Sequence, residues 1–405
     1  MRNVILTREY PPETVWGGCA IINHNLARML AKNGHEVHVI CQGVNKEYDT
    51  IEEGVYVHRV GTDAHTHSIT ARIKYMFAAW KRLKDLYREG NIDIVQADYW
   101  GGEGIICILQ NKSALVIKAQ AGAKSIINAK NYPDFKSYFG LLVLSRLANF
   151  TINRADSIIF ESKTNCSDIM SQINIDREKS CIIYNGIDTN HYCFTQVDRD
   201  KFGLPYGHIV LFVGRMEQIK GLDILVESIP TVLQKMPDTN FVLVGQDRDT
   251  APGGRSFKAW LKFKASEIGV DNKIIFKDAV TPKDLRLLYS ICDILVLPSR
   301  EESFGLVVAE AMSCGKPIVT TPVGIVQELA QENIRGIEIV PIGDAKKLAT
   351  GILKLLSLDN DEKVLIAKEN RCIIEQKYSL DRWSEQIIRV YDTILKKRKK
   401  LDIKL

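Results

Sequence analysis

The sequence predicts an α/β protein with two doubly wound domains, and three observations lead to this prediction. Short runs of solidly apolar residues, such as 4–6 and 209–213, are typical of strands buried on both faces of a sheet. Helix-length segments with apolar residues at helical spacing separate these runs. The alternation extends through one half of the chain and then through the other, and 405 residues suffice for two domains. Strands that alternate with helices form parallel sheets covered on both faces.

In the first half, the strand over 4–6 leads into a loop rich in proline and glycine. A helix follows that places Leu26 and Leu30 on one face and ends at Gly34. A second helix is expected over about 71–89. The remaining strands expected in this half are 36–41, 55–60, 92–97, 114–119, 157–160 and 181–184.

The second half begins with the strand 209–213, and a helix follows from about Gly221. Its other expected strands are 241–244, 273–276, 293–297, 317–321 and 337–340. A charge run at 198–201 and the turn residues Gly203 and Pro205 indicate a domain boundary between 189 and 207. The prediction is therefore an N-terminal domain over 1–195, a second domain over 196–375, and a last helix with a basic tail over 376–405.

The composition excludes several classes of protein. Hydrophobic residues make up 45% and charged residues 25%, which argues against disorder and coiled coil. The net charge of +5 is too small to imply a nucleic-acid partner. Nine scattered cysteines argue against a disulfide framework and favour a reducing cytosol. The apolar run at the N-terminus is too short for a signal peptide, and no run of about 18 apolar residues predicts a membrane span. We therefore expect a cytoplasmic protein.

The strongest motif follows the strand 293–297 directly and runs from Pro298 to Met312. It places Glu302 in a strand-to-helix loop, and Glu310 lies about one and a half turns into the helix. That helix is expected to begin near Phe304 or Gly305, so its free amides favour an anion; they are those of Gly305, Leu306 and Val307. Two carboxylates beside an anion site suit a sugar nucleotide. The alternative is that both glutamates are surface charges at a helix start.

A second motif, from Gly214 to Gly221, also connects a strand to a helix. Arg215 offers a planar fork and Lys220 a point charge, which together suit a diphosphate. Taken alone, the two cations are equally well explained as solvated surface residues. A weaker third signal is the pair Gly17-Gly18, where backbone before a helix could approach a phosphate or a sugar.

These strings resemble the retaining GT-B glycosyltransferases of family 4, the group 1 glycosyltransferases. The resemblance rests on the Glu302-to-Glu310 string, the string 214–221, the early glycine pair and the string 184–188, in the family's order and spacing. It covers essentially the whole chain and is firmest over 209–321. It implies the GT-B fold, with two Rossmann-like domains facing a central cleft, and a last helix that crosses back to the first domain.

The resemblance also implies roles for single residues. Arg215 and Lys220 would hold the donor diphosphate, Glu310 the ribose hydroxyls, and Glu302 the donor sugar. The backbone of residues 304–307 would lie near the sugar and the phosphate, and Gly18 would approach the phosphate from the other domain. Transfer would proceed with retention and form an α-linkage. A UDP- or GDP-sugar is then the expected substrate, and no cofactor is expected.

Two departures from the family pattern leave the acceptor side open. Family members often carry a histidine where this chain has Gln120, and another in the region of 96–102. Asp98 is the nearest polar candidate for orienting the acceptor hydroxyl. The chain contains two Asp-x-Asp strings, at 198–200 and 247–249. Strings of this kind bind a metal in a different glycosyltransferase fold, but a metal site needs more ligands than these two offer. We therefore expect no metal.

Some features indicate a membrane surface. The segment 71–89 forms a basic amphipathic helix whose expected apolar face is made of Ile73, Met76, Phe77, Trp80, Leu83 and Tyr87. We favour a helix packed on the core with a solvated basic face. The apolar segment 137–150 and the basic cluster 396–400 are further candidates, and a solvated terminus explains the cluster equally well.

The sequence thus predicts a retaining glycosyltransferase. It would move a hexose from a nucleotide sugar to a carbohydrate or lipid-linked acceptor, in cell-surface polysaccharide biosynthesis, from the cytoplasm or the inner face of the membrane. Two alternatives remain: a nucleotide-sugar epimerase on a similar fold, and a catalytically silent subunit that binds sugar nucleotides.

Overall fold

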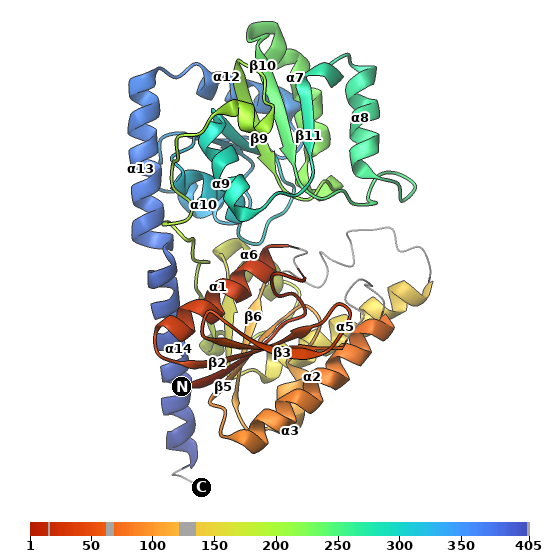
Figure 1. The fold of residues 1–405 in the computed structure, drawn as a ribbon, viewed down its shortest axis with the longest axis vertical. Helices are drawn as coiled ribbons and strands as arrows, with labels where there is room; N and C mark the ends of the chain where they lie inside the picture. Colours follow the sequence, from red (N-terminus) through yellow and green to blue (C-terminus); the bar gives the residue numbers. More distant parts are fainter. Residues whose placement is uncertain (15–16, 62–68, 121–134, 403–405) are drawn as a thin grey trace. The chain divides into compact units, whose positions relative to one another are not determined.

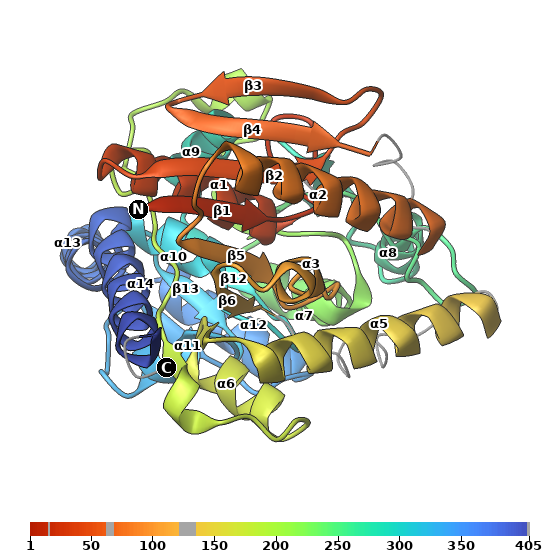
Figure 2. The same ribbon diagram turned by 90° about the horizontal axis from the view of Figure 1, so that it is seen from below.

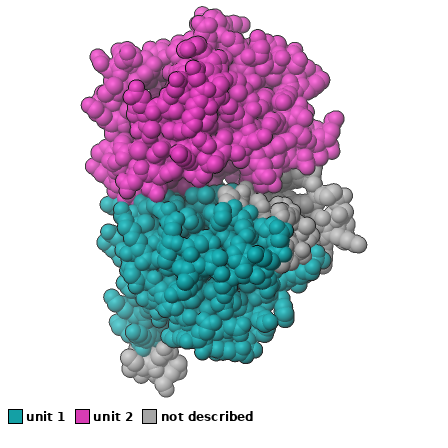
Figure 3. Space-filling view, viewed as in Figure 1, with its two compact units in different colours: residues 1–186, 380–405 teal, residues 187–379 magenta. Residues whose placement is uncertain are grey.

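The computed structural model describes residues 1–14, 17–61, 69–120 and 135–402. The chain divides into two compact units (Figure 3). Unit 1 combines Met1–Gly186 with Leu380–Leu405, and unit 2 is Ile187–Ser379. The divisions fall after residues 186 and 379, whereas the sequence predicted boundaries after 195 and 375.

Unit 1 contains an 8-stranded sheet with the order β3-β4-β2-β1-β5-β6-β7-β8 (Figure 2). The strands are β1 Arg2–Leu6, β2 Glu36–Gln42, β3 Tyr48–Glu52, β4 Val55–Val60, β5 Ile94–Asp98, β6 Ala114–Ala119, β7 Ser157–Phe160 and β8 Ser180–Ile182. The pairing of β3 with β4 is antiparallel and the others are parallel. The sequence did not predict β3, because this edge strand is polar and only half-buried.

The helices of unit 1 lie on both faces of this sheet, with α1 and α2 on opposite sides (Figure 1). They are α1 Gly18–Lys32, α2 Ile69–Glu89, α3 Ile105–Gln110, α5 Phe135–Arg154, α6 Lys163–Met170 and α14 Leu380–Asp402, with a short 3-10 turn, η1, at Arg177–Lys179. The chain runs outward from β1 through α1 and returns through α2 to β5. Because crossovers between parallel strands are right-handed, this reversal puts the two helices on opposite faces.

Helix α2 packs on the core, and the face that it uses coincides in part with the predicted one. Leu83 of the predicted face is buried, and three more of its residues pack against the core: Met76, Trp80 and Tyr87. Tyr75 is fully buried as well. By contrast, the side chains of Ile73 and Phe77 are 60% and 67% exposed. The packed face repeats at 75, 79, 83 and 86, which keeps step with 3.6 residues per turn. The expected apolar face therefore divides, and Ile73 and Phe77 lie outside the core.

Helix α14 belongs to unit 1 because its buried side reaches into the centre of that sheet. The hydroxyl of Tyr391 donates a 2.8 Å hydrogen bond to Oε1 of Gln96, on β5. Trp383 lies against Gly186, where a Cβ atom would come within 2.8 Å of the indole ring. The ammonium of Lys118, on β6, stands 5.0 Å from the centre of the same ring. No helix among the described residues is long and apolar enough to cross a membrane.

Unit 2 contains a 6-stranded parallel sheet with the order β11-β10-β9-β12-β13-β14. Its strands are β9 His208–Val213, β10 Thr239–Val244, β11 Ile274–Lys277, β12 Ile294–Leu297, β13 Ile318–Thr320 and β14 Ile337–Ile339. All were predicted to within two residues, because most of them are apolar runs bounded by polar loops. The helices are α7 Leu222–Lys235, α8 Phe257–Glu267, α9 Pro282–Ile291, α10 Leu306–Ser313, α11 Val326–Ala330, α12 Ala345–Leu356 and α13 Asn360–Tyr378.

The strand orders locate a binding edge in each unit. In unit 1 the order reverses between β1 and β5, and in unit 2 it reverses between β9 and β12. The loops that leave two such strands turn to opposite faces of the sheet and open a crevice at the carboxyl ends. Ligands of doubly wound sheets bind at this point. Both predicted motifs of the second half, 214–221 and 298–312, begin at the carboxyl ends of β9 and β12.

Candidate active site

Two loops of unit 2 are held together at the β9/β12 reversal. Gly221 precedes α7 with φ of +68°, and a Cβ atom there would lie 2.0 Å from the carbonyl oxygen of Pro298. Glycine is therefore required both for the backbone conformation and for the close approach. Arg300 adds a bidentate contact, because its guanidinium donates to both carboxylate oxygens of Asp223 at 2.8 and 2.6 Å. Sequence reasoning missed this second connection, because nothing in the spacing of the two residues marks it.

Lys220 and Glu302 meet where these loops touch. Nζ of Lys220 donates a 2.8 Å hydrogen bond to Oε1 of Glu302, and the Ser299 hydroxyl donates to the same oxygen at 2.9 Å. The Lys220 side chain is 15% exposed and that of Glu302 is 13% exposed. A charged pair screened this far from water interacts more strongly than a surface pair. The structure thus brings two of the predicted site residues into direct contact.

Arg215 lies on the first of these loops, directly after Gly214. Its side chain is 45% exposed, and its guanidinium contacts the carboxylate of Glu217 at 2.9 Å. This pair leaves most of the donor groups of the guanidinium fork for a ligand. Arg215 and Lys220 are therefore both cationic groups on the loop that leaves β9, one exposed and one largely covered.

Glu310 lies in the second turn of α10 and is buried, with 6% of its surface exposed. The Tyr289 hydroxyl donates a 2.8 Å hydrogen bond to Oε2 of Glu310, and Tyr192 also hydrogen-bonds to this carboxyl group. Burial raises the pKa of Glu310 to about 7, and the two tyrosine hydrogen bonds oppose that rise. Sequence reasoning did not anticipate these tyrosines, which come from α9 and from the segment between β8 and β9.

The start of α10 agrees with the predicted helix start. Gly305 caps the helix with φ of +91°, and Leu306 is its first residue. Leu306 and Val307 are half-buried, while Phe304 is 2% exposed. The carbonyl oxygen of Phe304 accepts a hydrogen bond from the amide of Ile325, which fixes the loop before the helix.

In unit 1, Asp98 ends β5 at the reversal of the strand order. Its carboxylate accepts hydrogen bonds from the Thr7 hydroxyl at 2.9 Å, from Nδ2 of Asn23 at 2.9 Å and from Nε2 of Gln120 at 3.2 Å. Burial, together with the nearby Glu103 carboxylate, raises the pKa of Asp98 to about 7. Asp98 is therefore held in place by side chains from three other segments.

Gln120, at the place of a frequent family histidine, is part of the same network. It is 5% exposed, and Sγ of Cys19 lies 2.6 Å from its Oε1 atom. Gly18, the first residue of α1, precedes Cys19 in the chain and is exposed. The residues next to Gln120, from 121, lie outside the described part of the chain, as do the side chains of 137–139 and 141 within the predicted segment 137–150.

A buried ion pair lies behind this network and was not predicted. Lys118 and Glu161 are 1% and 2% exposed and 3.5 Å apart, and Lys118 also donates to Oδ1 of Asn185 at 2.8 Å. Burial lowers the pKa of Lys118 and raises that of Glu161. The one signal in the sequence was a lysine inside the apolar strand 114–119. Asn185 precedes the end of the first segment of unit 1, so this pair anchors the chain where it leaves that unit.

Comparison with known proteins identifies the family. A family model for glycosyl transferases group 1 matches residues 195–371, and one for Glycosyltransferase Family 4 matches residues 16–191. The chain belongs to the group 1 glycosyltransferases. An uncharacterized glycosyltransferase of Methanocaldococcus jannaschii is 28% identical to this glycosyltransferase over 403 residues, which cover 96% of this chain and 98% of the relative.

Solved structures share the fold of this glycosyltransferase. A sucrose-phosphate synthase from Thermosynechococcus elongatus superposes with a TM-score of 0.79 at 18% identity, over 97% of this chain and 99% of that one. Anabaena HepE, solved in complex with UDP and glucose, gives 0.74 at 20% identity, with the same coverage. These structures confirm the predicted GT-B class, with its two Rossmann-like α/β domains.

The two Asp-x-Asp strings of this glycosyltransferase form hydrogen bonds with groups nearby in the chain. Asp247 accepts hydrogen bonds from the Ser256 hydroxyl and the Lys258 amide at the start of α8, and Asp198 accepts one from the Asp200 amide. Among the described residues, no group of three or more His, Cys, Asp or Glu side chains is placed to hold a metal ion.

Proposed function

We propose that this glycosyltransferase moves a hexose from a UDP- or GDP-sugar to a carbohydrate or lipid-linked acceptor. Transfer would retain the configuration of the donor and form an α-glycosidic bond, in the assembly of a cell-surface polysaccharide. The observation that carries the proposal is the contact between Lys220 and Glu302 at the β9/β12 reversal, with Arg215 on the same loop. A cation and an anion side by side match the two parts of a sugar nucleotide, its diphosphate and its sugar hydroxyls.

The donor diphosphate is assigned to Arg215 and Lys220. Lys220 is already desolvated, so a phosphate oxygen in its reach gains a strong charge-assisted hydrogen bond. The amides at the start of α10 are additional donors for an anion. Glu302 keeps its orientation through Ser299 when Lys220 turns to the phosphate, and can then accept from a sugar hydroxyl. The complex of Anabaena HepE with UDP and glucose supports a sugar nucleotide as the donor class.

The chemical step follows from these assignments. The bond between the anomeric carbon and the diphosphate oxygen breaks, and the bond between that carbon and the acceptor oxygen forms on the same face of the sugar. The acceptor proton goes to the leaving phosphate oxygen. Arg215 and Lys220 stabilise the negative charge that develops on the leaving group, which is where a preorganised cation lowers a barrier most.

The acceptor hydroxyl is assigned to Asp98. This carboxylate lies at the carboxyl end of β5, where an acceptor of unit 1 is expected to bind. Three side chains donate hydrogen bonds to it. The carboxylate lone pairs that remain can accept a hydrogen bond from the hydroxyl of the acceptor substrate.

A panel of sugar nucleotides tests the proposal directly. In the absence of acceptor, a glycosyltransferase with this site should slowly release free sugar and nucleoside diphosphate from its own donor. The epimerase alternative predicts a new sugar epimer instead, and a silent subunit predicts binding without turnover. Donor turnover that persists in excess EDTA would support the assignment of the diphosphate to Arg215 and Lys220, whereas strict dependence on a divalent cation would contradict it.

A further inference from the structure

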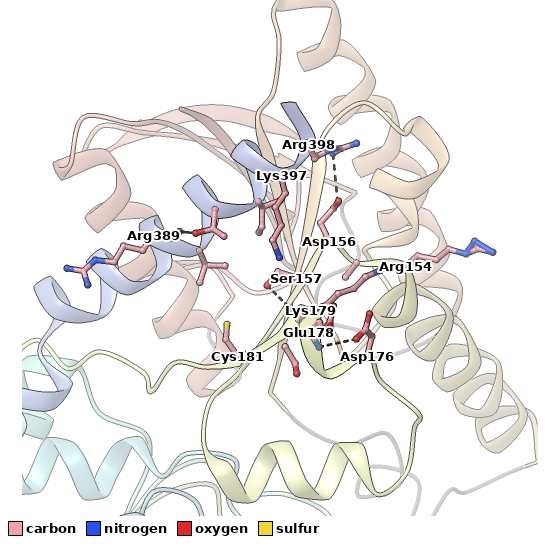
Figure 4. Close-up of a pocket in the computed structure, with 15 residues that line it drawn as sticks. Arg154, Asp156, Ser157, Asp176, Glu178, Lys179, Cys181, Arg389, Lys397 and Arg398 are labelled. Carbon is pink, nitrogen blue, oxygen red and sulfur yellow. Dashed lines mark hydrogen bonds and ion pairs between the residues drawn. The ribbon is translucent and has the colours of Figure 1, made fainter. Parts of the chain in front are cut away.

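Unit 1 has a second candidate binding site at the amino ends of its strands, whereas Asp98 lies at the carboxyl end of β5. A pocket of about 550 Å³ opens where β7 and β8 begin, between the end of α5 and the last turns of α14 (Figure 4). Asp98 ends β5 and Ser157 begins β7, and all strands from β1 to β8 other than β3 run parallel. The pocket therefore lies at the amino ends of the strands, away from the edge where doubly wound sheets bind their substrates. Its volume is in the range of small-molecule sites.

Basic side chains from three elements line this pocket, and Arg154 at the end of α5 is one of them. Lys179 comes from η1, and Lys397 and Arg398 come from α14. Figure 4 shows Lys397 reaching from α14 toward Ser157, at the start of β7, whereas the guanidinium of Arg389 points away from the other labelled residues. Lys179 and Lys397 are both exposed, and neither forms an ion pair with a described residue in this structure.

Two of the three carboxylates that line the same pocket are engaged, whereas that of Glu178 forms no ion pair with a described residue. Asp156 accepts a 2.8 Å hydrogen bond from the Leu115 amide and lies 3.9 Å from the Arg398 guanidinium. Asp176 accepts from the Glu178 amide at the start of η1. The lining holds five Lys and Arg side chains against three Asp and Glu side chains, so its net charge is positive. The pocket therefore has a positive charge to offer to a ligand.

The floor of the pocket is apolar. Ala155 and Ile394 are buried there, and Val390 and Cys181 line it as well. A site with an apolar floor and a few cations at its edge suits a ligand that combines an anionic group with a less polar body. A compact dianion of the phosphate type would gain charge-assisted hydrogen bonds from the two lysines and the arginine that line this pocket.

We propose that this pocket binds a ligand through a phosphate-type dianion, held by Lys179, Lys397 and Arg398. The phosphate belongs either to the headgroup of an anionic lipid or to a soluble phosphorylated molecule. Such a ligand would connect α14 to the strand edge formed by β7 and β8. The site is separate from the donor site, which is assigned to unit 2, and it does not depend on the proposed function.

The basic tail supplies a matched control for this proposal. Of the cluster 396–400, only Lys397 and Arg398 line the pocket, while Lys399 and Lys400 are exposed outside it. The variant Lys179→Gln/Lys397→Gln and the control Lys399→Gln/Lys400→Gln remove the same charge from exposed positions. Both should fold as the wild type does, which circular dichroism and thermal melting verify.

The first measurement is calorimetric titration with inorganic pyrophosphate. All proteins carry Arg215→Ala and Lys220→Ala, so that the predicted donor site does not contribute. We expect binding that weakens with added salt and that is about tenfold weaker or more in the pocket variant, because two charge-assisted contacts are lost. The control variant should bind as its parent does.

The second measurement separates the two sources of the phosphate. Co-sedimentation with vesicles of phosphatidylcholine containing 30% phosphatidic acid is compared with phosphatidylcholine alone. If the pocket variant loses binding to the acidic vesicles and the control variant does not, the phosphate belongs to a lipid headgroup. If the pocket variant binds pyrophosphate more weakly but its vesicle binding is unchanged, the phosphate belongs to a soluble molecule. Equal losses in both variants, or no loss of either kind of binding in the pocket variant, would overturn the proposal.

Discussion

Lys220 and Glu302 are 82 positions apart in the chain, and their side chains meet in a 2.8 Å hydrogen bond between the loops that leave β9 and β12. The contact exists because Gly221 allows the first loop to lie against Pro298 and because Arg300 connects the second loop to Asp223. The pair is thus positioned by the backbone before any ligand arrives. Groups held in this way need little reorganisation when charge develops on a bound substrate.

Substitution of Lys220 should weaken the donor site. In Lys220→Ala we expect donor binding or turnover to fall at least about tenfold, because a charge-assisted contact of more than about 1.4 kcal/mol is lost. Titration with the donor and initial-rate kinetics measure the effect. Lys264→Ala is the matched control, because Lys264 is an exposed lysine of α8 in the same unit and pairs with its helical neighbour Glu267.

The same comparison can refute the site assignment. Donor kinetics of Lys220→Ala that equal those of the wild type would remove the basis for placing the diphosphate here. An equal loss in Lys264→Ala would show that the overall charge of unit 2, rather than this position, controls binding.

Gly221→Ala should destabilise the protein and also weaken donor binding. The new Cβ atom would meet the Pro298 carbonyl at 2.0 Å, on a backbone with φ of +68°. Strain at positive φ and overpacking together should lower the free energy of unfolding by about 3 kcal/mol. Gly203→Ala is the control, since φ there is +58° but no atom lies within 4 Å. It should cost only about 1 kcal/mol and leave donor binding unchanged.

Chemical denaturation and donor titration of the two glycine variants give the answer. Equal losses of stability would mean that the close approach to Pro298 contributes nothing beyond the backbone conformation. Unchanged donor binding in a folded Gly221→Ala protein would mean that the spacing of the two loops does not matter for the site.

Most of the fold of unit 2 could be predicted from the sequence, because its strands are apolar runs and its motifs directly follow two of them. The edge strand β3 could not, since Tyr48 and Asp49 belong to a polar segment that pairs only with β4. Helix α2 shows a further limit. Its apolar residues extend around more of the helix than the sheet covers, so the sequence alone could not say that Ile73 and Phe77 stay exposed.

The candidate site was predictable only as a set of cations and carboxylates at strand ends. Which partners hold them depends on residues distant in sequence. Tyr289 contacts Glu310 from 21 positions away, and Thr7 contacts Asp98 from 91 positions away. The spacing of a motif places a residue at the end of a strand, but only the folded structure shows which neighbours engage it.

Glu310 should make the stability of the protein depend on pH. Its pKa is raised by burial from 4.5 to about 7, so this group stabilises the fold fully below pH 4.5, and its contribution is lost as the pH rises through about 7. Calorimetric melting of Glu310→Gln between pH 5 and 8 should therefore show a smaller decline in Tm than the wild type. A Tm that falls with pH to the same extent in both proteins would contradict a raised pKa for this carboxyl group.

If Glu310 also binds the donor ribose, donor affinity should change in the opposite direction. The ionised carboxylate accepts hydroxyl hydrogen bonds more strongly than the neutral acid does. Donor affinity of the wild type should thus rise between pH 6 and 8, and Glu310→Ala should bind the donor at least about tenfold more weakly. Affinity that is independent of pH, together with normal binding by the alanine variant, would restrict Glu310 to a structural role beside Tyr192 and Tyr289.

Asp98→Asn should separate the acceptor from the donor. The pKa of Asp98 is raised by burial to about 7, so the carboxylate form that can accept a hydrogen bond from the acceptor hydroxyl becomes dominant as the pH rises above 7. Wild-type kcat/KM for the acceptor should increase across that range. The asparagine variant keeps the shape but not the charge, and its kcat/KM for the acceptor should be at least about tenfold lower and lack this increase.

Donor hydrolysis without acceptor is the internal control for this variant. It depends on residues of unit 2, so its rate should equal that of the wild type if Asp98 acts only on the acceptor. Thr7, Asn23 and Gln120 all donate hydrogen bonds to the Asp98 carboxylate. An equal loss of hydrolysis and transfer would therefore show that the substitution disturbs this hydrogen-bond network. In that case Asp98 would be a structural residue, and the acceptor hydroxyl would need another partner at the carboxyl edge of the sheet.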